Sequence, residues 1–359
     1  MQSEQARAGR HVAVMGTGSW GTTLAILSAR QGLAVSLLAR TEAEANLLRE
    51  AGENTRFVPG YPFPESLTVT ASAEEALRDC EMLLMVVPSQ TMRDNIRSLK
   101  PYLGGMKKEA IVVSAAKGLE LGTLLRMTEV LGEELGAGWE ERLAALSGPN
   151  LAKEIVASKP ATTVIGASHL ETAQHAQELL TGGRFRVYTN PDVIGVELGG
   201  ALKNIIAVAA GMADGMKAGD SSKAALITRG LVEIGRLGVA AGASLFTFAG
   251  LAGLGDLIAT CASPLSRNRT LGDLLAQGHT MEETRTIMRG QVAEGLTTTV
   301  AARELAARHG VEMPITQQLY EVLFEGKSAM LGLSALLTRE PTDEFLSLGV
   351  TTDDGRPTT

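Results

Sequence analysis

Short apolar runs alternate with helical patterns through the first half of the chain. The runs are rich in Val, Leu and Met and are bounded by Gly, Pro or Ser, as is typical of strands buried on both faces. We expect strands at His11–Met15, Val35–Ala39, Met82–Val87, Ile111–Ser114, Leu143–Leu146, Ala161–Ile165 and Phe185–Tyr188. Helical stretches such as Gly21–Gln31 and Glu42–Ala51 lie between them. This alternation predicts an α/β domain with a mostly parallel, doubly wound sheet.

The pattern changes after Asn190-Pro191. From Asp192 to about Leu337 nearly every stretch has a helical period and is rich in Ala, Leu and Gly. We therefore expect an α/β domain over residues 1–191 and an all-α domain over residues 192–340. Residues 341–359 are polar and rich in Thr, Asp and Pro, which predicts a flexible tail.

Composition narrows the class of protein. A chain of 359 residues, 45% hydrophobic and 20% charged, suits a globular protein with two cores. The net charge of -7 argues against nucleic acid as a partner, since that partner requires a basic face. Cys80 and Cys261 are too few for a disulfide framework, and neither they nor the five scattered histidines have metal-ligand spacing. We expect reduced thiols, no metal and a cytoplasmic location.

Two segments bear on membrane association. Met1–Arg10 is polar and leads directly into the first predicted strand, so we expect no secretion signal. The longest apolar run, Val193–Ala213, contains Glu197, Lys203 and a Gly-Gly pair. We interpret this run as a buried core helix of a soluble protein and not as a membrane span.

A glycine-rich loop follows the first predicted strand. Gly16-Thr-Gly18-Ser-Trp-Gly21 has the pattern G-x-G-x-x-G and opens a predicted helix. In such a loop the first glycine permits a tight turn, the second lets the backbone approach a pyrophosphate, and the third allows close packing of helix and strand. This context predicts a dinucleotide site in a Rossmann-type domain; a purely structural turn is the alternative.

Arg40 bears on the choice of dinucleotide. It stands at the end of the second predicted strand, 19 positions past Gly21, where NAD-preferring folds usually carry an acidic residue. A cation there suits a 2′-phosphate, so the sequence favours NADP, or the use of both NADP and NAD. Alternatively, Arg40 is a solvated residue with no part in the choice.

Lys203 lies on a stripe of small residues. On a helix its near neighbours are Gly199, Gly200, Ala207 and Ala210, which leaves room for a ligand or for a closely packed element. The flanking positions are apolar, so desolvation should lower the lysine pKa toward a range useful for proton transfer. The alternative is a lysine that extends to the surface.

Two further polar residues follow predicted strands. Lys117 comes after Ile111–Ser114, and Asn150 comes after Leu143–Leu146 in Ser-Gly-Pro-Asn. Ligands of doubly wound folds bind at the carboxyl ends of parallel strands, which makes both residues candidates for a site. Each residue taken singly is more often structural.

The helical half contributes a second group of candidates. Asp256 and Thr260 are four positions apart and should share one face of a helix. Ser266-Arg267-Asn268 offers a hydroxyl, a guanidinium and an amide in succession, a composition suited to binding phosphate.

Taken together, these motifs resemble a known family. Over residues 10–337 the chain is similar to the bacterial-type NAD(P)-dependent glycerol-3-phosphate dehydrogenases. The resemblance is carried, in order and at close to the family's spacing, by Gly-Thr-Gly-Ser-Trp-Gly at 16–21, Ala-Ala-Lys-Gly-Leu-Glu at 115–120, Ser-Gly-Pro-Asn at 147–150, Glu-Leu-Gly-Gly-Ala-Leu-Lys-Asn at 197–204, Gly-Leu-Gly-Asp-Leu at 253–257, Ser-Arg-Asn at 266–268 and Val-Ala-Glu-Gly at 292–295.

The resemblance implies an activity and a set of roles. The enzyme would reduce dihydroxyacetone phosphate to sn-glycerol 3-phosphate, supplying phospholipid synthesis, and would form a homodimer. Lys203 would be the general acid/base with Asp256 beside it, and Lys117 would polarise the substrate. The residues lining the substrate would also include Gly148, Asn150, Ser266, Arg267 and Asn268, with Arg267 on the phosphate. Besides the loop glycines, those contacting the dinucleotide would be Ser19, Trp20, Arg40, Lys117, Ala152, Arg267, Val292 and Glu294.

One departure and two alternatives accompany this interpretation. Asn150 stands where many bacterial members have Ser or Thr, which puts in doubt the hydrogen bonding at that position but not the activity. A related two-domain dehydrogenase acting on a 2-keto or β-hydroxy acid would need a carboxylate clamp instead of a phosphate clamp. A catalytically inactive NADP(H)-binding sensor would leave Lys203, Lys117 and Asp256 without a purpose.

Overall fold

The computed structural model describes residues 9–288 and 291–340. The predicted tail at 341–359 and most of the predicted polar segment Met1–Arg10 lie outside the described residues. Contacts divide the chain into two compact units, Met1–Glu197 and Leu198–Thr359. The division falls within one long helix, α9 (Val193–Gly215), a few residues after the boundary expected from sequence.

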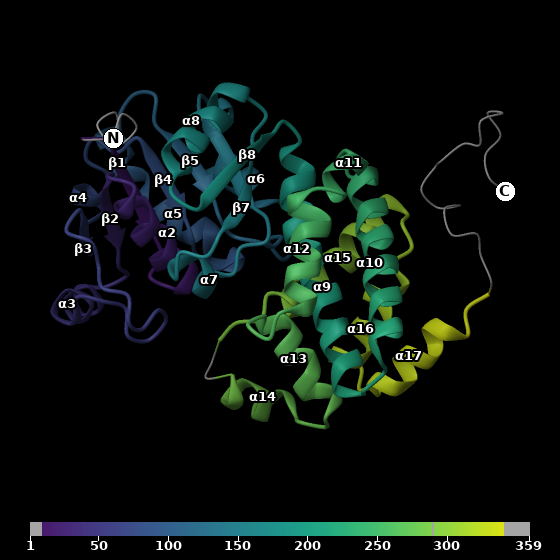
Figure 1. The fold of residues 1–359 in the computed structure, drawn as a ribbon. Coiled ribbons are helices and arrows are strands. Elements are labelled where there is room, and N and C mark those ends of the chain that lie inside the picture. Colours follow the sequence, from purple (N-terminus) through teal and green to yellow (C-terminus); the bar gives the residue numbers. More distant parts are fainter. Residues whose placement is uncertain (1–8, 289–290, 341–359) are drawn as a thin grey trace. The chain divides into compact units, whose positions relative to one another are not determined.

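The first unit is built on one sheet of eight described strands, which Figure 1 shows in purple to teal. Their order is β3-β2-β1-β4-β5-β6-β7-β8, and every neighbouring pair is parallel except β6 and β7. The strands are β1 (His11–Met15), β2 (Ala34–Leu38), β3 (Leu67–Thr70), β4 (Met82–Met85), β5 (Ile111–Ser114), β6 (Leu143–Ser147), β7 (Ala161–Gly166) and β8 (Phe185–Asn190). The strand order reverses direction at β1 and β4, where ligands of this architecture bind.

The predicted strands are confirmed, with corrections at some of their ends. β2 stops at Leu38 and β4 stops at Met85, before the positions expected from sequence. Beyond Met85 the chain reaches Pro88, which has no N–H to donate, and turns into the short helix η1 (Ser89–Thr91). Strand β3 was not predicted from sequence, because its four residues alternate with threonines and form only an edge of the sheet.

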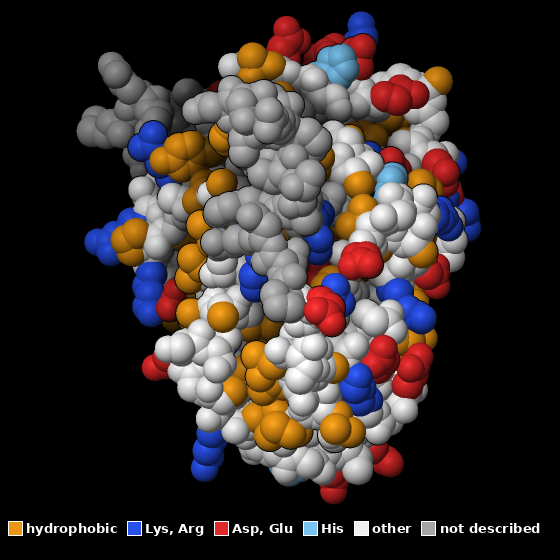
Figure 2. Space-filling view, turned by 90° about the vertical axis from the view of Figure 1, so that its right-hand side faces the viewer, with side chains coloured by type: hydrophobic (Ala, Val, Ile, Leu, Met, Phe, Trp, Pro, Cys, Tyr) orange, Lys and Arg blue, Asp and Glu red, His pale blue; other side chains and the backbone are white. Residues whose placement is uncertain are grey.

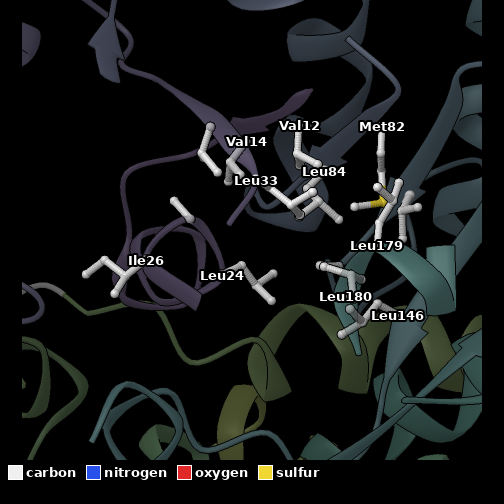
Figure 3. Packing of buried hydrophobic residues seen from close by; sticks show 14 of the residues in the cluster. Val12, Val14, Leu24, Ile26, Leu33, Met82, Leu84, Leu146, Leu179 and Leu180 are labelled. Atoms are coloured by element: carbon white, nitrogen blue, oxygen red, sulfur yellow. The ribbon is translucent and has the colours of Figure 1, made fainter. Parts of the chain in front are cut away.

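Helices cover both faces of this sheet. Successive side chains of β1 point to opposite faces of the sheet, so Val12 and Val14 lie in one buried cluster and Ala13 and Met15 lie in another. Figure 3 shows the first cluster, in which Leu24 and Ile26 of α2 and Leu179 and Leu180 of α8 join Val12 and Val14. The second cluster takes residues from α5 and α6. The helices of this unit are α2 (Ser19–Arg30), α3 (Glu42–Ala51), α4 (Ala73–Leu77), α5 (Met92–Leu99), α6 (Met127–Leu135), α7 (Ala152–Val156) and α8 (Leu170–Leu180).

All described elements of the second unit are helical, as expected. Besides the remainder of α9 they are α10 (Asp220–Ala240), α11 (Leu245–Phe248), the π-helical turn η4 (Leu251–Gly255), α12 (Asp256–Ala262), α13 (Arg267–Ala276), α14 (Met281–Ile287), α15 (Gly295–His309), α16 (Pro314–Phe324) and α17 (Ala329–Leu337). Glycines let two helices approach closely: a Cβ on Gly211 of α9 would lie 1.9 Å from Arg269 O, and one on Gly272 of α13 would lie 1.9 Å from Val208 O. This contact brings the start of α13 alongside α9.

Among the described residues, two stretches are long and apolar enough to cross a membrane, judged by length and composition alone. In α9, 83% of the most apolar window is buried, as expected for a core helix. The second stretch, Leu245–Ala262, is 44% buried and consists of α11, η4 and α12. Glu197 of α9 is held within the first unit by hydrogen bonds from Thr128 N (2.8 Å) and Arg126 (2.6 Å), so it caps the start of α6.

Charged side chains of both signs are interspersed on the face shown in Figure 2. Within the first unit, the single guanidinium of Arg93 donates to three carboxylates, those of Glu120 (2.7 Å), Glu133 (2.8 Å) and Glu134 (2.9 Å). A nucleic-acid surface would instead gather lysine and arginine in a patch or stripe.

Candidate functional site

The glycine loop forms a tight cradle between β1 and α2. Gly16 has φ of +121°, and a Cβ on it would lie 2.3 Å from Val86 O. A Cβ on Gly21 would lie 1.9 Å from Gly16 O, so any side chain there would force helix and loop apart. Gly18, in contrast, has open space where its Cβ would be. The first and third glycines are therefore required by packing, and the second leaves room for a ligand against the backbone.

The start of α2 suits an anion. Gly18 is its N-cap and offers no side-chain cap, and the first turn has no acidic residue. The first N–H groups of a helix carry the positive end of its dipole and bind phosphate readily. Beside them, Trp20 Nε1 is buried with no hydrogen-bond partner among the described residues. These features fit the pyrophosphate and the adjoining part of a dinucleotide.

Arg40 and Glu44 lie together at the end of β2. The Arg40 side chain is 78% exposed, and its Nε is 3.6 Å from Glu44 Oε2. Glu44 also accepts hydrogen bonds from Arg40 N (3.1 Å) and from Thr17 Oγ1 of the glycine loop (2.6 Å). The expected cation is thus present at the strand end, but it is paired with a carboxylate that sequence reasoning missed.

Lys117, Gly148 and Asn150 gather at the carboxyl ends of β5 and β6. Lys117 Nζ donates to Gly148 O at 2.9 Å. Asn150 Nδ2 donates to Thr163 Oγ1 (2.9 Å), while Asn150 Oδ1 is buried with no partner among the described residues. A Cβ on Gly148 would lie 3.2 Å from Thr163 Cα, so glycine permits the turn. The cluster offers an ammonium and an amide oxygen at the ligand-binding edge of the sheet.

Ala152 lies on the same side of the first unit as the glycine loop. It begins α7, and its carbonyl oxygen accepts a hydrogen bond from Thr23 Oγ1 of α2 (3.4 Å). The residue expected to contact the dinucleotide is therefore placed against the helix that the glycine loop opens. Ser19, another such residue, is the first residue of that helix.

The second unit contains a buried lysine, aspartate and threonine in mutual contact. Lys203 on α9 is 6% exposed, and its Nζ lies 2.7 Å from Asp256 Oδ1 and 2.6 Å from Thr260 Oγ1. Thr260 Oγ1 in turn donates to Asp256 Oδ1 at 3.2 Å. The prediction that Asp256 and Thr260 share one helical face is confirmed, and Lys203 is a buried residue and not one that extends to the surface.

The small residues beside Lys203 have a packing role. A Cβ on Gly199 would lie 2.8 Å from Ala252 O, in the π-helical turn that precedes Asp256. In that turn, a Cβ on Gly253 would lie 2.1 Å from Phe248 O. Gly199 allows the backbone before α12 to come close to α9, and Gly253 allows the turn to pack against the end of α11. This approach brings the Asp256 carboxylate within reach of the Lys203 ammonium.

Ser266, Arg267 and Asn268 form the start of α13. Ser266 caps the helix by accepting from Arg269 N (3.2 Å), and Arg267 is its first residue. Within the described residues the Arg267 side chain is exposed, and its guanidinium interacts electrostatically with Glu294, which precedes α15. A guanidinium at a helix N-terminus is well suited to a phosphate or carboxylate.

Both polar atoms of the Asn268 side chain form hydrogen bonds within the protein. Its Nδ2 donates to Asn204 Oδ1 (2.8 Å), and its Oδ1 accepts from Gly295 N (2.9 Å). Asn204, next to Lys203, was not singled out from sequence, although it stands inside a recognised motif. Through these bonds the lysine helix, the start of α13 and the start of α15 are joined. Val292 (51% exposed) and Glu294 lie immediately before α15.

The remaining candidate chemistry is limited. Burial raises the pKa of both free thiols, Cys80 and Cys261, to about 12, so neither is a ready nucleophile. Among the described residues no group of three or more His, Cys, Asp or Glu could hold a metal ion.

Comparison with known proteins identifies relatives that match most of the chain. Models of the NAD-dependent glycerol-3-phosphate dehydrogenase N-terminus and C-terminus match residues 11–173 and 192–332. Glycerol-3-phosphate dehydrogenase (NAD(P)+) of Moorella thermoacetica is 49% identical over 336 residues, covering 94% of this chain and 98% of that protein. The protein of the same name from Streptomyces coelicolor is 46% identical over 332 residues, covering 92% and 97%.

A solved structure agrees with these relatives. The glycerol-3-phosphate dehydrogenase of Coxiella burnetii is similar with a TM-score of 0.86 and 39% identity, over 92% of this chain and 99% of that one. The similarity extends over both the sheet and the helical unit, since so little of either chain is left uncovered.

Proposed function

Because the chain belongs to the NAD-dependent glycerol-3-phosphate dehydrogenase family, we propose that it interconverts dihydroxyacetone phosphate and sn-glycerol 3-phosphate with NADP(H) or NAD(H). The observation that carries this proposal is the buried Lys203 ammonium, held by Asp256 and Thr260 on a scaffold shared with the relatives. A carbonyl reductase needs such a group, because charge grows on the carbonyl oxygen during the reaction.

The first unit would bind the dinucleotide, which when bound supplies or accepts the hydride. The glycine loop residues Gly16, Gly18 and Gly21 would cradle the pyrophosphate, with the open space at Gly18 supporting this role. Arg40 would lie at the adenosine ribose. Further contacts are proposed for Ser19, Trp20, Lys117, Ala152, Arg267, Val292 and Glu294.

Lys203 would act as the general acid in the reducing direction. Its compact cation can attract the growing negative charge and then deliver a proton to the same oxygen. Asp256 and Thr260 fix the position of Nζ and keep the ammonium from turning away. In the oxidising direction the neutral amine would remove the hydroxyl proton, by the same path reversed. Lys117 would polarise the substrate.

The phosphate of the substrate would be held at the start of α13. Arg267 supplies a bidentate donor there, and the helix N-terminus favours a negative group. Ser266 and Asn268 are proposed as further substrate contacts in this unit, and Gly148 and Asn150 as substrate contacts in the first unit. The internal bonds of Asn268 indicate that it also fixes the local backbone, besides any direct contact.

Several broader properties belong to the same proposal. Residues 1–191 would be the dinucleotide-binding domain and residues 192–340 the substrate-binding domain. The protein would work in the cytoplasm as a homodimer with no membrane span, and its product would serve phospholipid synthesis. The family match, and not the geometry of the site, favours this activity over the alternative dehydrogenase and the inactive sensor.

One set of assays tests the activity. Oxidation of NADPH and of NADH is followed with dihydroxyacetone phosphate, unphosphorylated dihydroxyacetone and a series of 2-keto acids in parallel. We expect rapid turnover with the phosphorylated ketone alone. A preference for a 2-keto acid would overturn the proposed substrate, and binding of dinucleotide without turnover of any ketone would favour a sensor.

A further inference from the structure

The carboxylate of Glu44 lies between the glycine loop and the end of β2, and it has no role in the function proposed above. Glu44 is the third residue of α3, whose N-cap Thr41 accepts a hydrogen bond from Glu44 N (3.2 Å). Its side chain is 25% exposed and turns toward the loop, where Oε1 accepts from Thr17 Oγ1 (2.6 Å). Thr17 stands between Gly16 and Gly18 and is itself buried.

The other oxygen of Glu44 faces the end of the strand. Oε2 accepts from Arg40 N at 3.1 Å and is 3.6 Å from Arg40 Nε. The carboxylate thus touches both elements that border the adenosine ribose in this architecture, the glycine loop and the second strand end. Partial burial opposes ionisation, but the bonds from Thr17 and Arg40 N hold the pKa of Glu44 below its ordinary value. At neutral pH the group is therefore an anion.

The charges beside the end of β2 differ from both the usual NAD-binding pattern and the usual NADP-binding pattern. An acidic residue alone would favour the 2′-hydroxyl of NAD, and an arginine alone would favour the 2′-phosphate of NADP. Here the arginine and the carboxylate are ion-paired, so the attraction of Arg40 for a phosphate dianion is opposed by a negative charge a few ångströms away. The same carboxylate can accept a hydrogen bond from a neutral hydroxyl.

We propose that Glu44 is a specificity-determining residue: by neutralising Arg40 it weakens selection for the 2′-phosphate and keeps NAD(H) a usable cofactor. This inference rests on the proposed dinucleotide-binding function. Discrimination between NADP(H) and NAD(H) depends on the difference between the two binding affinities, and a repulsive group can change that difference as much as an attractive one.

The test compares dissociation constants for NADPH and NADH, measured by the fluorescence of the reduced nicotinamide on binding. Glu44→Gln removes the charge and keeps an oxygen for Thr17, and Glu44→Ala removes the same charge with a different side chain. Glu42→Gln is the matched control, since Glu42 lies on the same first turn of α3 but pairs with Arg49. Each variant is measured with both ligands, so a general loss of fold would weaken both together.

We expect both Glu44 variants to bind NADPH about three- to tenfold more tightly relative to NADH, the scale of one partly screened surface charge. Glu42→Gln should leave the ratio unchanged. The inference is overturned if the Glu44 variants keep the wild-type ratio, if they bind NADPH more weakly, or if Glu42→Gln shifts the ratio equally. Wild-type protein that binds neither dinucleotide would instead overturn the proposed function, and this inference with it.

Discussion

Lys203 Nζ lies 2.7 Å from Asp256 Oδ1, and both side chains are almost entirely withdrawn from solvent. A buried ammonium and carboxylate at this distance stabilise each other's charge, although removing both from water has a cost of several kcal/mol. Thr260 completes the contact by accepting from the lysine and donating to the aspartate. The arrangement holds a cation in a fixed place inside an apolar unit, which general acid catalysis requires.

Replacing Lys203 with alanine should reduce kcat by about 10² or more, the usual scale for the loss of an acid or base. Dinucleotide affinity should change little, because the glycine loop is untouched. The variant leaves Asp256 buried without its cation, so we also expect a loss of about 3–5 kcal/mol of stability. Steady-state kinetics, NADPH binding and chemical unfolding measure these three quantities separately.

Lys223→Ala provides the control for that variant. Lys223 on α10 also forms an ion pair within the second unit, with Asp214 at 2.7 Å. We expect this variant to keep near-normal turnover at temperatures where it is folded. Near-normal turnover by folded Lys203→Ala would contradict the assignment of Lys203.

Arg40→Asp should weaken NADPH binding far more than NADH binding. The substitution replaces attraction to the 2′-phosphate with repulsion and adds to the charge of neighbouring Glu44. Dissociation constants for the two dinucleotides are the measurement. An equal loss for both would show that Arg40 does not distinguish the phosphate.

Arg267→Ala should strongly raise KM for dihydroxyacetone phosphate and also lower kcat, since binding energy from the phosphate helps to position the carbonyl. The weak activity on dihydroxyacetone should hardly change, because that ketone has no phosphate to lose. Arg267→Lys should recover only part of the loss, because an ammonium cannot provide the bidentate contact. Assays at saturating NADPH separate this effect from any contact with the cofactor. The same factor lost on both ketones would exclude Arg267 as the phosphate clamp.

Glu233→Ala should destabilise the second unit by about 2–4 kcal/mol. Glu233 is 2% exposed and caps the start of α16, accepting from Ile315 N (2.7 Å), Thr316 N (2.9 Å) and Thr316 Oγ1 (2.7 Å). Its removal leaves buried donors without an acceptor. Urea unfolding measures the loss, and Glu304→Ala, at an exposed position of α15, should change stability little. Equal stability of the two variants would contradict the capping role.

The same residue should make stability depend on pH. Burial raises the pKa of Glu233 above its ordinary value of about 4.5, so the folded state favours the protonated form. Its contribution is fully present below that value and is lost as the pH rises through the folded-state pKa. The unfolding free energy of the wild type minus that of Glu233→Gln should therefore decrease as the pH rises above about 4.5. A difference that stays constant or increases over this range would be inconsistent with the raised pKa.

Short-range sequence patterns were sufficient to predict a strand where both of its faces are buried. Central strands such as β1 and β5 are buried on both faces, so their continuous apolar runs predict them to the residue. Strand β3 lies at an edge, carries threonines and has only four residues, so its pattern is weak. Apolar runs also do not indicate that β7 runs antiparallel to β6, because strand direction depends on how the chain connects the two strands.

The sequence by itself determined the glycine loop, the positions of the buried strands along the chain, the helical second half and the motif residues, because each depends on spacing within a short segment. Only the tertiary structure decided which of these residues meet. Lys203 and Asp256 are far apart in sequence, and their contact depends on Gly199 letting the backbone at Ala252 approach α9. Glu44 pairs with Arg40 and Thr17 because a strand end, a loop and a helix start converge there. Such convergence is set by packing across elements, and no single segment contains it.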